Sequence, residues 1–75
     1  MNNLINSNIG HSMSFSILGK YSSAGDYMEW KIIESNLDGY VSLVKFDRRN
    51  EETSLKVSYF RIDHITHFSI NNQLC

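Results

Sequence analysis

The chain has 75 residues, 41% of them hydrophobic, and a formal net charge of −1 from seven Lys and Arg against eight Asp and Glu. This length allows one domain with one small core, and the near-neutral charge argues against a protein that binds nucleic acid mainly through its overall charge. The single cysteine, the lack of a signal-peptide pattern and the lack of an apolar run of about 18 residues favour a cytoplasmic protein without a membrane span.

The N-terminal residues 1–11 show no hydrophobic period, because their three aliphatic side chains are scattered among four asparagines. We expect a flexible arm here. The alternative is that these aliphatic residues, Leu4, Ile5 and Ile9, dock onto a neighbour.

The first predicted strand covers residues 12–17, where serine alternates with Met13, Phe15 and Ile17. A period of two is typical of a half-buried strand, so these three apolar residues should face the core. Gly19 follows as a bulge or a close approach of two backbones.

Residues 27–34 predict a second strand, with Trp30 and Ile32 on its inner face. A helix over 27–37 is the rival interpretation, because Asp26 and Glu29 have the spacing of a capping box. The apolar residues form no single stripe on a helical wheel, which favours the strand. The Asp38-Gly39 dipeptide then predicts a hairpin.

Residues 40–47 are apolar on both faces, as expected of a central strand covered on both sides. Residues 54–62 alternate clearly, and 65–70 follow after a tight turn at Asp63-His64. The sequence therefore predicts one all-β domain over 12–71, a small, partly open antiparallel barrel of about five strands, and a polar tail over 72–75. A helix over 27–37 would make the fold α+β instead. The absence of proline leaves strand edges unguarded and favours a homo-oligomer.

No set of residues suggests catalysis, a cofactor or a metal centre. His64 and His67 would fall on opposite faces of a strand, and Cys75 lies on the polar tail. We therefore expect a protein that is not an enzyme.

Exposed tyrosines beside arginines are typical contacts for a protein partner. The candidate contact residues are Tyr40, Arg48, Arg49, Tyr59 and Arg61. A second set could bind phosphates, with a tyrosine stacking on a base: Lys45, Arg48, Arg49 and Lys56. Two plainer interpretations stay open, ordinary surface tyrosines and a charged turn in which Glu51 and Glu52 neutralise the arginines.

The segment Phe-Arg-Ile-Asp-His-Ile-Thr-His-Phe over residues 60–68 resembles the end of Sm-like small barrels. It is similar to the "R-L-D-x-I-T-x-F" stretch of the Rho-inhibiting antiterminator family Rof, with matches at Arg61, Asp63, Ile65, Thr66 and Phe68. The resemblance implies an Sm-like or SH3-like barrel that binds a protein or RNA. Our leading hypothesis is a small protein-binding regulator or inhibitor, of the kind that phages and mobile elements direct at a host machine. The alternative is an Sm-like oligomer that binds or sequesters RNA or a nucleotide.

Overall fold

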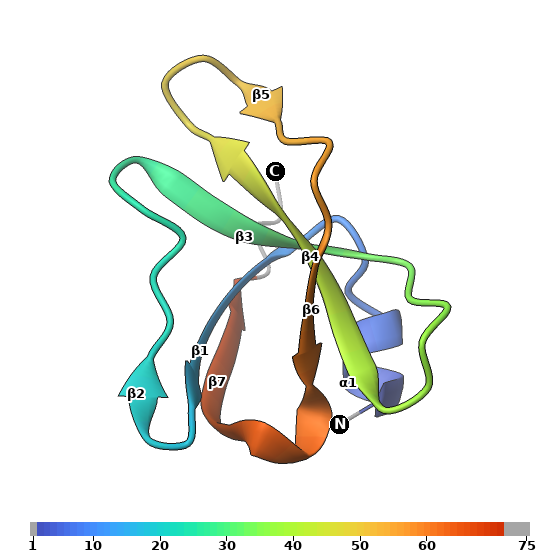
Figure 1. Cartoon of the computed structure of the whole chain (residues 1–75). Coiled ribbons are helices and arrows are strands. Elements are labelled where there is room, and N and C mark those ends of the chain that lie inside the picture. The colour runs from blue at the N-terminus through green and yellow to red at the C-terminus, as the bar shows by residue number, and fades with distance from the viewer. Residues whose placement is uncertain (1, 72–75) are drawn as a thin grey trace.

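One antiparallel sheet with a short N-terminal helix makes up the computed structural model, which describes residues 2–71 (Figure 1). The elements in chain order are α1 (Asn2–Asn6), β1 (Ser12–Ile17), β2 (Lys20–Tyr21), β3 (Met28–Ile33), β4 (Tyr40–Asp47), β5 (Glu52–Thr53), β6 (Ser58–Arg61), the 3-10 helix η1 (Ile62–His64) and β7 (Ile65–Asn71). Neither helix is long enough or apolar enough to cross a membrane.

The longer strands follow the order β7-β1-β3-β4-β6, with β2 beside β1 and β5 beside β4. Strands β6 and β7 form the two ends of this order and do not pair with each other, so the curved sheet stays open. This confirms the predicted all-β fold, a small, partly open antiparallel barrel.

The core lies inside the curve of the sheet and is built around three aromatic rings. Phe60 meets Phe15 and Trp30 edge-on, with ring centroids 5.0 and 5.4 Å apart, an arrangement that the quadrupoles of aromatic rings favour. The indole N–H of Trp30 donates a hydrogen bond to the carbonyl oxygen of Ser22 at 3.0 Å, so the buried ring keeps no unpaired donor. Ile32 and Leu43 are fully buried in the same cluster.

The strand interpretation of the second segment is confirmed. β3 pairs with β4 over six positions, from Met28 opposite Asp47 to Ile33 opposite Ser42, and it contains no helical turn. The predicted hairpin is present too. Gly39 has a φ of +84°, a conformation that glycine adopts without a steric cost.

The expected flexible arm contains the helix α1 instead, and Ile5 of this helix packs into the core. Ile5 in α1 is only 4% exposed and belongs to the core cluster, whereas Leu4 and Ile9 are about half exposed. Two backbone hydrogen bonds fix the following residues to β3, from the Gly10 N–H to the Ile32 carbonyl at 2.8 Å and from the Ile32 N–H to the His11 carbonyl at 3.0 Å. A single buried side chain creates no hydrophobic period, so the sequence pattern of residues 1–11 did not indicate that Ile5 is buried. The predicted tail over 72–75 lies outside the described residues.

Two further local expectations differ from the structure. Gly19 lies in a two-residue hairpin turn between β1 and β2, where Leu18 and Gly19 both have positive φ, rather than in a bulge. Residues 54–57 are not a strand, and Leu55 is 98% exposed. They connect β5, which pairs with one end of β4, to β6, which pairs with the other end.

Candidate interaction surfaces

Three of the predicted contact residues, Tyr40, Tyr59 and Arg61, lie together on the outer side of β4 and β6. Tyr40 is directly opposite Arg61, and Val41 is opposite Phe60. Because Val41 is fully buried and Phe60 packs against the core, Tyr40, Tyr59 and Arg61 lie on the opposite side of the two strands, which they share with the buried Ser42. Tyr59 is 53% exposed and Tyr40 is half-buried. We call these three residues the tyrosine face.

Tyr40 stands between two hollows in the surface. One, of about 420 Å³, is lined by residues 38–40 and 61–63. The other, of about 270 Å³, is lined by residues 35–40 together with Asn6 from α1. A ring flanked by two hollows offers an incoming surface both a projecting anchor and places to insert side chains.

The guanidinium of Arg61 is held by Asp63 in a two-point hydrogen bond, Nε to Oδ1 at 3.1 Å and Nη2 to Oδ2 at 2.8 Å. Both side chains are more than half exposed, so the ion pair adds little to stability. Its effect is to fix the direction of the arginine beside Tyr40. A two-point contact of this kind restricts the fork of the guanidinium more than a single bond does.

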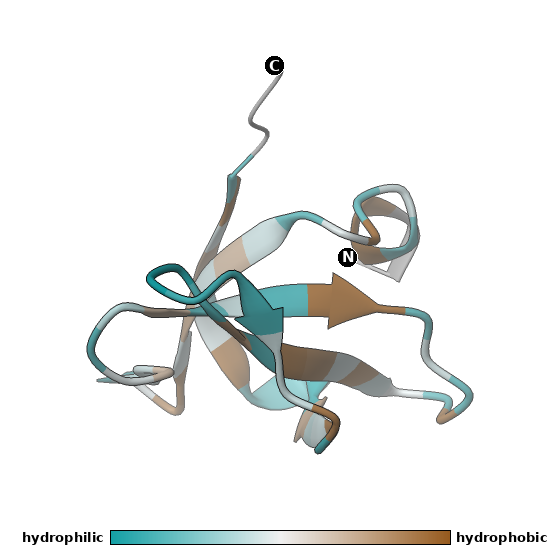
Figure 2. Cartoon of the chain, turned by 90° about the horizontal axis from the view of Figure 1, so that it is seen from above, coloured by the Kyte–Doolittle hydropathy of each residue, from teal (hydrophilic) through white to brown (hydrophobic). Residues whose placement is uncertain are grey.

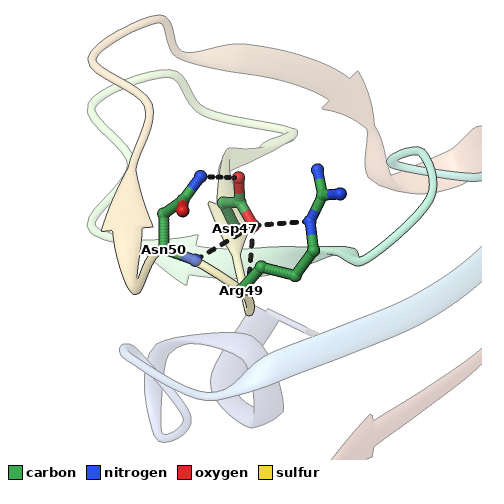
Figure 3. Close-up of polar contacts among 3 residues, drawn as sticks. All are labelled: Asp47, Arg49 and Asn50. Atoms are coloured by element: carbon green, nitrogen blue, oxygen red, sulfur yellow. Dashed lines mark hydrogen bonds and ion pairs between the residues drawn. The ribbon is translucent and has the colours of Figure 1, made fainter.

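The turn after β4 is organised by Asp47 (Figure 3). Its carboxylate accepts backbone N–H groups from Arg49 at 2.9 Å and Asn50 at 3.4 Å, and the side-chain amide of Asn50 at 2.9 Å. These bonds, with the Arg49 N–H first among them, lower the pKa of Asp47 below its ordinary value of 3.8. Arg49 pairs with Asp47 at 3.8 Å, so Asp47 takes the neutralising role that the sequence suggested for Glu51 and Glu52.

The two arginines of this turn meet Tyr27. The guanidinium of Arg49 lies 4.5 Å from the centre of the Tyr27 ring, and the backbone N–H of Arg48 donates to the Tyr27 carbonyl oxygen at 2.9 Å. Arg48 also lines a groove of about 440 Å³ together with Tyr21 and Tyr27. Tyr27 was expected within a strand, and its position beside the arginines depends on the β3–β4 register, which no local pattern in the sequence reveals. Figure 2 shows this turn as a hydrophilic, teal loop.

The remaining lysines of the predicted phosphate set have other surroundings. The ammonium of Lys45 lies 5.4 Å from the centre of the Trp30 ring, and Lys56 is exposed on the segment between β5 and β6. Arg49 is engaged by Tyr27 and Asp47. Two of the four members, Lys45 and Arg49, thus lie against aromatic rings, and the phosphate-binding role of the set stays a prediction.

The predicted contact residues divide into two groups at opposite ends of β4. Tyr40 begins this strand and Arg48 follows its last residue. Eight steps along an extended strand cover about 26 Å, at about 3.3 Å per residue. The tyrosine face and the arginine turn are therefore two separate groups of side chains, one at each end of β4.

Within residues 2–71, no group of three or more His, Cys, Asp or Glu side chains is placed to hold a metal ion. Cys75 lies outside the described residues. Comparisons with family models, curated proteins and solved structures find no match. The resemblance of residues 60–68 to the Rof family stays a prediction from the sequence, and the surfaces described above are the basis for function.

Proposed function

We propose that this protein is a small, non-enzymatic regulator or inhibitor that binds a protein partner through the tyrosine face. One observation carries the proposal: the β4–β6 register brings Tyr40, Tyr59 and Arg61 to one outward surface beside two hollows. Tyrosine and arginine are enriched among the residues that dominate protein–protein binding energy. An action on a host machine on behalf of a phage or mobile element, and a cytoplasmic location, belong to the same proposal.

The charges near the tyrosine face also favour a protein over a nucleic acid. Arg61 is paired with Asp63, and Asp38 lines the same hollow. A phosphate backbone would meet two carboxylates beside one arginine that is already paired. A protein surface can match such mixed charges with its own.

RNA or nucleotide binding by an oligomer is the second candidate. The observation in its favour is the groove that Arg48 shares with Tyr21 and Tyr27, since an arginine and two rings can hold a phosphate and stack on a base. This activity would be lost steeply as salt is added. Binding through the tyrosine face would depend on salt much less.

The experiment compares capture of proteins from nuclease-treated lysate of the native host by three immobilised forms of the chain. They are the wild type, the double variant Tyr40→Ala/Tyr59→Ala, and the control Tyr21→Ala, which removes a tyrosine that is 69% exposed elsewhere on the surface. Trp30 fluorescence checks that each form is folded.

We expect one protein that the wild type and Tyr21→Ala retain equally and that the double variant retains at least 30-fold less. A loss of about 2 kcal/mol at one hot-spot residue already weakens binding about 30-fold. Equal retention by all three forms would show that the tyrosine face is not the binding surface. A partner that the wild type captures from untreated lysate but not from nuclease-treated lysate, or that is lost at moderate salt, would favour the second candidate.

A further inference from the structure

Strand β7 has one edge that no described strand covers. It runs from Ile65 to Asn71 and pairs with β1 over six positions, but within residues 2–71 no strand pairs with its other side. Its sequence, Ile-Thr-His-Phe-Ser-Ile-Asn, contains no Pro, Gly, Lys, Arg, Asp or Glu. Proteins usually protect an exposed edge with charges, proline, bulges or a very short strand. β7 has one register irregularity, at Thr66, but no charge or proline over its seven residues, and residues 67–71 pair with β1 without a shift.

Phe68, at the centre of β7, is an apolar side chain that the core does not fully cover. Its cross-strand partner is Phe15, so the two side chains share the inner face of the sheet. Phe15 is 2% exposed, whereas Phe68 is 37% exposed. The difference arises because β1 has neighbours on both sides and β7 has one. An additional strand along β7 would satisfy its backbone groups and cover Phe68 in the same step.

We propose that the additional strand is β7 of a second copy of this chain, paired antiparallel about a two-fold axis at Phe68. A seven-residue strand has its fourth residue at the centre, so Phe68 faces the partner's Phe68. His67 then faces the partner's Ser69, and the irregularity at Thr66 marks the end of the regular pairing on each side. This register places aromatic against aromatic and puts no like charges opposite each other. An isologous two-fold contact is also the commonest arrangement of homo-oligomers.

Strand β6, the other end of the sheet, is a poorer partner for β7. It has four residues, so three positions of β7 would stay unpaired, and it ends in Arg61. Its outward side chains already belong to the tyrosine face. The matched length of two β7 strands leaves no such mismatch.

The first measurement is sedimentation velocity of the wild-type chain over a wide concentration range. We expect a concentration-dependent equilibrium between monomer and dimer, because a contact along one strand edge is small. A monomer at every concentration would overturn the proposal. A larger closed assembly would also overturn it, since two-fold pairing through β7 ends at two copies.

The second measurement tests the register by cross-linking. In a Cys75→Ser background, Phe68→Cys places a thiol directly opposite its counterpart in the dimer, within reach of a disulfide. Asn71→Cys is the matched control at the exposed end of the same strand. In this register the position 71 residues of the two chains lie six residues apart along the paired strands. Mild oxidation should give a covalent dimer of the Phe68→Cys form at least tenfold faster than of the Asn71→Cys form. Equal rates, or faster coupling at position 71, would show that the strands do not pair about Phe68.

Discussion

Replacing Ile5 by Ala tests whether α1 is part of the folded domain. Ile5 is 4% exposed and belongs to the core cluster. The change removes three buried carbon atoms, which at about 0.8 kcal/mol for each corresponds to about 2.4 kcal/mol of transfer free energy. The cavity left behind raises the expected loss to about 2.5–4 kcal/mol. A domain of this size is stabilised by only about 3–5 kcal/mol, so the variant should be close to unfolding at room temperature.

The assay is urea unfolding followed by the fluorescence of Trp30, the one tryptophan of the chain. With a slope of about 1 kcal/mol per molar urea, the midpoint of Ile5→Ala should fall by about 2.5 M or more, or the folded baseline should be lost. The matched control is Leu4→Ala in the same helix, where the side chain is 46% exposed. Its loss should stay below about 1 kcal/mol, as expected of a largely exposed position. If both variants unfold at the wild-type midpoint, α1 does not contribute to the core and the reasoning fails.

Two further predictions concern polar groups of β4. The hydroxyl of Ser42, a residue only 1% exposed, has no hydrogen-bond partner among the described residues. Ser42→Ala should therefore raise the free energy of unfolding by about 1 kcal/mol. If urea unfolding shows a lower free energy instead, the hydroxyl has a hydrogen-bond partner in the folded protein. The backbone N–H of Arg49 is the main cause of the lowered pKa of Asp47. The ionised carboxylate therefore stabilises the fold fully above the ordinary pKa of 3.8, and this stabilisation is lost as the pH falls through the lower pKa of the folded state. Between pH 5 and pH 3 the urea midpoint of Asp47→Asn should therefore fall less than that of the wild type, and parallel decreases would contradict this.

The strands that the sequence predicted well are those with a neighbour along their full length. Alternation at 12–17 coincides with burial of Met13 and Phe15 because β1 lies between β3 and β7. Residues 54–57 alternate as clearly, but they pass from one end of β4 to the other without a continuous ladder. Alternation reports which face of a strand could be buried, and only pairing determines whether the strand forms.

The candidate surfaces depend on which residues of neighbouring strands lie opposite each other. No short stretch of the sequence reveals this register. Tyr40 and Arg61 were both predicted as contact residues, yet their contact follows from the pairing of β4 with β6. The same pairing geometry separates Arg48 from Tyr40 by the length of a strand. The choice of Asp47 over Glu51 as the partner of Arg49 depends on backbone N–H groups aimed at one carboxylate, a detail of turn geometry.

The two proposed surfaces lie on the two ends of one open sheet, and this arrangement makes them compatible. The tyrosine face is on the outer side of β6 and β4, while the edge of β7 is at the other end of the strand order. Pairing through the backbone edge of β7 uses none of the side chains of the tyrosine face, so a dimer would carry two such faces and would be bivalent. A partner that is itself repeated, such as a ring or a filament, would then bind far more tightly than a single face allows, provided that both faces can reach it. A modest interface on a 75-residue chain would in this way be enough to hold a much larger machine.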